Sequence, residues 1–257
     1  MRLETAPTGS PIAKGTPMHP TTSTPRFRLL VPGVAIAALL ATLALALPRA
    51  SADPAAPASL ARHDGHGGAV ATTHLPHTAA QLALHDQMRR LWEDHITWTR
   101  LAIVTFADGS AGFSPTAGRL LENQDDIGDA IKPYYGDAAG ERLTALLRDH
   151  ITIAVDVLKA AKAGDTGAFA SAKARWYANA DDIADLLASA NPRFWPQSMM
   201  RADMREHLDQ TLAEAAHELG GDYAASIADY EQVHTHILAM ADLLSSGIIR
   251  QLPGRVG

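Results

Sequence analysis

Residues 119–131 read R-L-L-E-N-Q-D-D-I-G-D-A-I, and residues 175–187 read R-W-Y-A-N-A-D-D-I-A-D-L-L. The two segments are identical at six of 13 positions and begin 56 residues apart. In each of them the apolar residues recur at spacings that place them on one face of an α-helix. The chain therefore carries the same helical pattern twice, which predicts an all-helical fold with an internal repeat.

A second set of related segments lies on the neighbouring helices. They read W-E-D-H-I-T at 92–97, L-R-D-H-I-T at 147–152 and M-R-E-H-L-D at 204–209, so their histidines are 55 and 57 residues apart. The last helix carries H-I-L-A-M-A-D-L-L at 236–244, which aligns His236 with Asn123 and Asn179. This pattern predicts three repeated αα-hairpins. The alternative is that helical hairpins of similar length converge on similar sequences.

Capping residues and glycines divide residues 78–252 into about six helices. Thr78 and Asp222 are typical N-caps, Gly164 is typical of a helix end, and Ser114-Pro115 supplies an N-cap followed by proline at the first helical position. The expected helices span 78–107, 114–133, 137–164, 165–191, 196–219 and 222–251. Short connections between them favour antiparallel neighbours. We therefore expect one all-α bundle of about six antiparallel helices over 78–252, with a tail at 253–257.

The first 77 residues have a different composition. Residues 29–47 form an uncharged apolar run, preceded by Arg26 and Arg28 and followed by Ala50-Ser51-Ala52. This order predicts a secretory signal peptide over 1–52, with cleavage before Asp53 and a true start at Met1 or Met18. The alternative is an uncleaved membrane anchor at 29–47, because 19 apolar residues just span a bilayer. Either way we expect an exported protein, whether extracellular, periplasmic or on the cell surface.

Residues 53–77 are rich in Pro, Ala and Gly and lack apolar periodicity, so we expect a flexible tether. The tether contains His63, His66, His74 and His77, and a His-rich exported tract is able to take up Zn²⁺ or Cu²⁺. The other interpretation is that these histidines are ordinary polar residues of a linker.

Charge and cysteine content limit the partners. Residues 1–52 contain five of the 22 basic residues and one of the 28 acidic residues, so the remainder has a formal charge of −10. This balance disfavours a nucleic-acid partner and leaves the N-terminal segment as the only expected membrane contact. The chain has no cysteine, so any metal site has to use His, Asp, Glu or other oxygen ligands.

Several polar residues fall on the apolar faces of the expected helices. His95 and His150 lie within apolar stripes, His207 lies about one position from the stripe of its helix, and Asn123 and Asn179 are inward amides by the same pattern. Burying such groups destabilises the fold unless each one finds a hydrogen-bonding partner.

Two outcomes satisfy that requirement. In the functional one, His95, His150, His207 and His236 bind a divalent metal ion (Zn or Cu) or a small polar ligand, with Asn123, Asn179, Asp126 and Asp182 as further ligand-binding residues. In the structural one, a bundle that serves architecture or protein interaction uses its buried His and Asn only to fix helix register. A metal-dependent enzyme is a third possibility. The chain has no H-E-x-x-H pair, and we assign no catalytic residue and favour a non-enzymatic protein.

Four strings carry a resemblance to known proteins: E-D-H-I-T-W-T-R (93–100), N-Q-D-D-I-G-D-A-I-K-P-Y-Y-G (123–136), D-H-I-T-I-A (149–154) and R-W-Y-A-N-A-D-D-I-A (175–184). They resemble an uncharacterised family of small bacterial all-helical proteins over about residues 88–252. The resemblance implies the limits of the domain. It implies no activity, because that family has none agreed.

Overall fold

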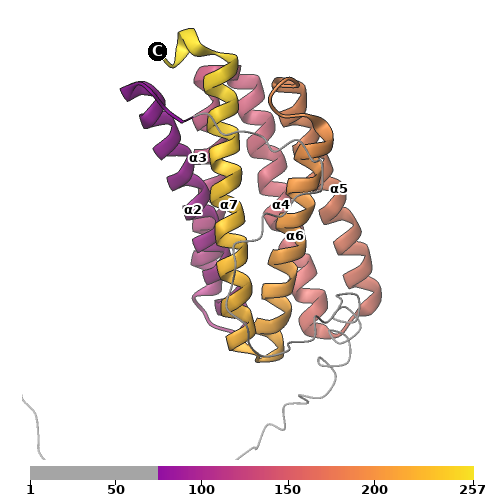
Figure 1. Ribbon diagram of the computed structural model, residues 1–257. Coiled ribbons are helices and arrows are strands. Elements are labelled where there is room, and N and C mark those ends of the chain that lie inside the picture. Colours follow the sequence, from indigo (N-terminus) through magenta and orange to yellow (C-terminus); the bar gives the residue numbers. More distant parts are fainter. Residues whose placement is uncertain (1–74) are drawn as a thin grey trace, which may run out of the picture. The chain divides into compact units, whose positions relative to one another are not determined.

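The computed structural model describes residues 75–257 and contains six α-helices and no strand within that range. The helices are α2 (Ala79–Ala107), α3 (Phe113–Tyr135), α4 (Asp137–Ala163), α5 (Thr166–Ala190), α6 (Gln197–Gly220) and α7 (Tyr223–Gln251). They lie side by side as a bundle (Figure 1). The predicted all-α bundle of six helices is therefore confirmed. The predictions for the leader at 1–52, the apolar run at 29–47 and most of the tether at 53–77 fall outside the described residues.

The helix ends follow the capping chemistry of the sequence. The Thr78 hydroxyl accepts a hydrogen bond from the Gln81 amide at 3.1 Å, and the Asp222 carboxylate accepts one from the Ala225 amide at 3.1 Å. Each bond satisfies an amide that has no partner inside its own helix. Gly164 ends α4 with a φ of 68°, a left-handed conformation that glycine adopts without a side-chain clash.

The second helix differs from its predicted limits at both ends. It begins at Phe113 with Gly112 at the N-cap position, so the prediction of Ser114 as the N-cap and Pro115 as the first helical residue is wrong. The Phe113 ring packs edge-on against Phe106 of α2, with ring centroids 5.1 Å apart. It also continues through Pro133 to Tyr135 and ends at Gly136, whose φ is 87°. Proline near a C-terminus interrupts only one hydrogen bond of the last turns, so the helix persists for two more residues.

Packing closes the bundle around a single interior. Each helix packs along the next one in the chain, α2 also packs along α7, and α6 contacts both α2 and α4. Contacts such as those of Phe106 with Phe113 and of Leu91 with Asn123 show that α2 and α3 run in opposite directions. The position of α6 between α2 and α4 brings side chains from these three helices to one place in the interior.

The α3–α4 crossing depends on two glycines. A Cβ atom on Gly128 would lie 2.8 Å from the Gly140 carbonyl oxygen and 1.9 Å from the Thr144 hydroxyl. A Cβ atom on Gly140 would lie 2.7 Å from the Gly128 carbonyl oxygen. The two backbones approach more closely than any side chain allows, so these positions fix the spacing of the two helices.

The chain end belongs to the bundle. Residues Pro253–Arg255 form a 3₁₀ turn, η1, and Arg255 donates a hydrogen bond to the Tyr134 carbonyl at 2.8 Å. Val256 is buried in the main core. The segment predicted as a tail at 253–257 thus packs on the helices. Within residues 75–257 no helix combines the length and the apolarity that crossing a bilayer requires.

We predict that Gly128→Ala destabilises the fold by about 1–3 kcal/mol, because the new methyl group meets backbone across the helix crossing. Gly118→Ala is the matched control on the same helix, since a Cβ there has nothing within 4 Å, and it is expected to stabilise α3 by up to about 1 kcal/mol. Urea unfolding midpoints of the two variants measure the difference. Equal midpoints would contradict the close approach of α3 and α4.

Candidate functional site

Three histidines from three helices line one interior cavity. His95 of α2, His150 of α4 and His207 of α6 are 3%, 3% and 4% exposed, and all three contribute to a cavity of about 50 Å³. The rest of the lining is apolar apart from the threonines Thr99 and Thr211. Both threonine hydroxyls donate at 2.8 Å to a backbone carbonyl one turn earlier on their own helix. The imidazoles are therefore the main polar groups that the cavity offers to a ligand.

The tautomer of His150 follows from its partner. Asn179 of α5 donates through its amide nitrogen to the Leu146 carbonyl at 3.1 Å, which leaves its amide oxygen facing His150 Nδ1 at 2.8 Å. An amide oxygen only accepts, so His150 Nδ1 carries the proton and donates it. The other ring nitrogen, Nε2, therefore carries a lone pair. The ring also packs on Trp176, with centroids 5.2 Å apart.

His95 is held by amides of α3. Gln124 is fully buried, and its amide nitrogen lies 3.2 Å from His95 Nδ1 and donates to the Leu120 carbonyl at 2.8 Å. Asn123 donates to the Leu91 carbonyl at 3.0 Å. The sequence pattern identified Asn123 as an inward amide but not Gln124. It is the Gln124 side chain that contacts the His95 imidazole.

His207 lies between two other imidazoles. Its ring centroid is 5.9 Å from that of His95 and 6.4 Å from that of His236, with which it stacks at an interplanar angle of 13°. His207 Nδ1 is buried and has no hydrogen-bonding partner. His236 lies at the edge of the core, and its Nε2 donates to the Asp203 carbonyl at 3.1 Å. His207 is thus the least satisfied of the buried histidines.

One contact recurs in the helix pairs α2–α3, α4–α5 and α6–α7. Asn123 reaches the Leu91 carbonyl, Asn179 the Leu146 carbonyl and His236 the Asp203 carbonyl, and each carbonyl lies four residues before the buried histidine of its hairpin. The alignment of His236 with the two asparagines predicts this equivalence. The internal repeat itself stays a prediction.

Burial keeps the three cavity histidines uncharged. Loss of hydration lowers the pKa of His95 to about 3, with repulsion by His150 as a second cause. Burial likewise lowers the pKa of His150 to about 4, against the opposing hydrogen bond to Asn179. The pKa of His207 falls well below its usual value through burial and through repulsion by the other imidazoles. All three are therefore neutral at pH 7. His150 Nε2 has a free lone pair, whereas the lone pair of His95 Nδ1 accepts a hydrogen bond from the Gln124 amide, which leaves the His95 proton on Nε2.

Asp126 and Asp182, which the sequence suggested as ligand-binding residues, are exposed and lie outside the cavity. Asp126 forms an ion pair with Arg119 at 3.5 Å, and Asp182 lines a surface groove between α4 and α5. Both aspartates are three residues after a buried asparagine, about 60° around the helix from it. This rotation away from the buried asparagines turns the carboxylates to solvent.

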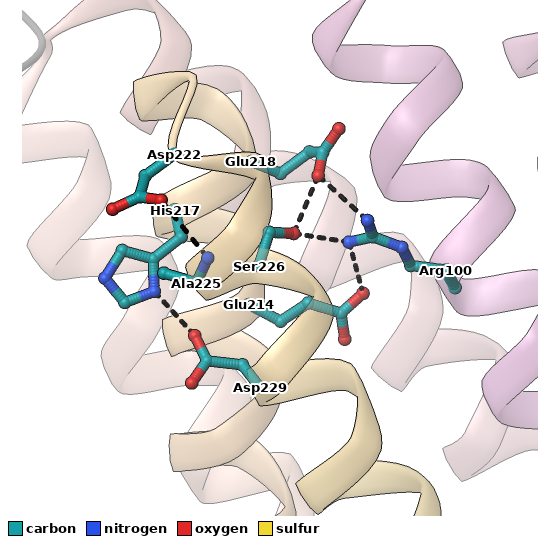
Figure 2. Close-up of polar contacts among 8 residues, drawn as sticks. All are labelled: Arg100, Glu214, His217, Glu218, Asp222, Ala225, Ser226 and Asp229. Carbon is teal, nitrogen blue, oxygen red and sulfur yellow. Dashed lines mark hydrogen bonds and ion pairs between the residues drawn. The ribbon is translucent and has the colours of Figure 1, made fainter.

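A second buried polar cluster joins α2, α6 and α7 (Figure 2). Arg100 reaches Glu214 at 3.1 Å and Glu218 at 3.0 Å, and it also donates to the Ser226 hydroxyl, which in turn donates to Glu218 at 2.7 Å. Glu214, Glu218 and Ser226 are buried. Burial raises the pKa of Glu214 to about 7 despite its bond to Arg100, and its Oε2 has no partner. One guanidinium therefore faces two carboxyl groups.

The sequence analysis missed this cluster, although α6 carries a signal for it. His207, Thr211, Glu214 and Glu218 recur at spacings of four, three and four, which is the same period as an apolar stripe. All four side chains are buried. The sequence of this helix therefore contains a stripe of polar residues with helical spacing next to its apolar stripe, and this stripe indicates buried polar side chains.

Known proteins add no assignment: no family model, no curated protein and no solved structure matches the chain. Within residues 75–257, no three His, Asp or Glu side chains are grouped closely enough to hold a metal ion as they stand. The interpretation of the cavity thus depends on its own geometry.

We predict that the protein loses stability on acidification from pH 6.5 to 4.5. The unfolded chain takes up protons on its histidines below their usual pKa of 6.5, while His95, His150 and His207 stay neutral in the fold, so each costs up to about 1.4 kcal/mol per pH unit. Glu214 acts in the opposite direction, because its raised pKa makes the folded state bind the extra proton between pH 4.5 and 7.

The measurement is the urea midpoint as a function of pH for the wild type and for Glu214→Gln. The variant removes the opposing contribution, so its stability should fall more steeply with acid than that of the wild type. A stability that rises from pH 6.5 to 4.5 in both proteins would show that the cavity histidines are protonated in the fold.

Proposed function

We propose that this protein is an exported, non-enzymatic helical bundle that binds a metal ion in its interior through His95, His150 and His207. The observation that carries the proposal is that three buried, neutral imidazoles from α2, α4 and α6 line one cavity. Imidazole binds metals through a lone pair, so a histidine that is already neutral needs no deprotonation to become a ligand.

The surroundings of the histidines support this proposal. Metal-binding histidines commonly donate their second ring nitrogen to an oxygen, which fixes the tautomer and the orientation of the ring. Asn179 does this for His150, and Gln124 restrains His95 from α3. His236 stacks on His207 from outside the cavity and acts in this proposal as a positioning residue. Asn123 and Asn179 likewise orient the helices and rings without binding the ion.

A structural role is the competing proposal, and one observation favours it. Asn123, Asn179 and His236 each bond to a backbone carbonyl of the preceding helix, so these groups fix helix register without any ligand. This explanation accounts for the side chains around the cavity. It does not account for His207 Nδ1, which is buried and has no hydrogen-bonding partner. In a purely structural role, this unsatisfied nitrogen would reduce the stability of the fold by about 1–3 kcal/mol.

We predict stoichiometric binding of one Zn²⁺ or copper ion by the full-length protein after His63, His66, His74 and His77 are replaced by asparagine. These replacements remove the histidines of residues 53–77, because a His-rich tract is able to bind metals independently of the bundle. Changing His95, His150 or His207 to Asn should weaken binding at least about 100-fold, because an amide is a poor metal ligand. Calorimetric titration measures the affinity.

The matched control is His217→Asn, because His217 lies on α6 outside the cavity and pairs with Asp229. It should bind metal as the parent does. Urea midpoints for all variants accompany the titrations. Should the parent bind neither metal stoichiometrically while the cavity variants lose stability, the structural role is correct and the metal site is not.

A further inference from the structure

We propose that the N-terminal part of α7, residues 223–232, is a flap that a proton on Glu214 holds against α2 and α6 and that opens when Glu214 ionises. This inference does not depend on what the cavity binds. It follows from the way in which the flap is attached to the bundle and from the charges of the Arg100 cluster, which comprises Arg100, Glu214, Glu218 and Ser226 (Figure 2).

The flap is attached to the bundle mainly through this cluster. Within residues 223–232, Ser226 is the only buried residue, whereas the later turns of α7 lie in the main core. Tyr230 packs partly on that core, and its ring lies 5.9 Å from the Arg100 guanidinium. Tyr223 and Ile227 are 57% and 55% exposed. A segment with so few buried apolar contacts opens at a lower free energy than the core of the same protein.

The Arg100 cluster contains one cation and two carboxyl groups. Glu218 accepts a hydrogen bond from Ser226 at 2.7 Å and lies 3.0 Å from the Arg100 guanidinium, so both contacts favour its ionised form. Glu214 contacts Arg100 at 3.1 Å through Oε1, while its Oε2 is buried and has no partner among the described residues. A carboxylate oxygen that is buried without a donor destabilises the charged form. The proton of the cluster therefore belongs on Glu214.

The groups around Glu214 make its ionisation sensitive to pH near neutrality. Burial raises the pKa of Glu214 to about 7 against the effect of Arg100 of α2, and repulsion by Asp229 of α7 and by Glu218 adds to the rise. Asp229 is itself paired with His217 of α6 at 2.6 Å. Helices α4 and α5 also pack on α6, but within residues 75–257 they add no charged group to this set.

Opening of the flap lets water reach the carboxylate of Glu214, which then regains an ordinary pKa of 4.5. The closed form thus binds one proton more than the open form between pH 4.5 and 7. The proportion of the open form therefore increases as the pH rises through this range, and it stays constant at higher pH.

Amide hydrogen exchange of the full-length protein, followed by NMR between pH 5.5 and 8, tests the flap. The protection factors of amides 227–232 correct for the intrinsic pH dependence of exchange. We expect them to fall by up to about tenfold per pH unit as the pH approaches 7 and then to level off. Amides that exchange through global unfolding should respond in the opposite direction below pH 6.5, because the cavity histidines destabilise the fold in acid.

Variants assign the effect to Glu214. Glu214→Gln has a side chain of the same size that does not ionise, so protection of residues 227–232 should no longer depend on pH. The matched control is Glu231→Gln, which changes an exposed carboxylate of the flap and should behave as the wild type does. His217→Asn removes the neighbouring pair with Asp229 and should also keep the wild-type pH dependence.

Wild-type protection that is the same at pH 5.5 and 8 would overturn this inference. A pH dependence that persists in Glu214→Gln, or one that disappears in His217→Asn, would overturn it as well, because the proton would then act at another group.

Discussion

The burial of uncharged imidazoles is the constraint on which the interior of this bundle depends. His95, His150 and His207 occupy positions where an apolar side chain would pack without any further requirement. Each imidazole instead demands a partner for its ring N–H and leaves a lone pair to be satisfied. Asn179 and Gln124 are buried beside two of the histidines for this reason. Asn179 and Asn123 also donate to backbone carbonyls of the preceding helix and so fix helix register.

Helix α6 concentrates the polar groups of the core. His207 and Thr211 line the cavity, while Glu214 and Glu218 meet Arg100 in a separate cluster nearer the end of the helix. A buried ion pair of this kind contributes little net stability, because desolvation offsets most of the attraction. Burial raises the pKa of Glu214 to about 7, against the opposing effect of its bond to Arg100. The same helix also buries apolar side chains, among them Met200, Met204 and Leu208, in the main core.

Much of the fold was predictable because it depends on local chemistry. Three helices begin after a side chain that accepts a hydrogen bond from the first turn: Thr78, Asp165 and Asp222. The inward orientation of His95 and His150 follows from helical periodicity alone. The start of α3 was predicted two residues late, with Ser114 instead of Gly112 as the N-cap. The contact of Phe113 with Phe106 is made between helices and leaves no mark in the local pattern.

The candidate site was predictable in part for the same reason. Periodicity identifies which face of a helix is inward, but it does not say which inward residues from different helices meet. Gln124 was missed because its partner lies on another helix, and Arg100 was missed because a long side chain reaches a buried carboxylate from the border of the core. Asp126 and Asp182 are exposed, because an offset of about 60° from a buried residue can decide between core and solvent.

The central claim is that the cavity imidazoles are neutral and that Asn179 sets the tautomer of His150. Long-range ¹H–¹⁵N correlation spectra of the metal-free, ¹⁵N-labelled protein, with assignments from single His→Asn variants, measure both properties directly. At pH 6, below the ordinary histidine pKa of 6.5, we predict that His95, His150 and His207 are uncharged and that His150 carries its proton on Nδ1. Imidazolium signals from these residues, or a proton on Nε2 of His150, would contradict the account.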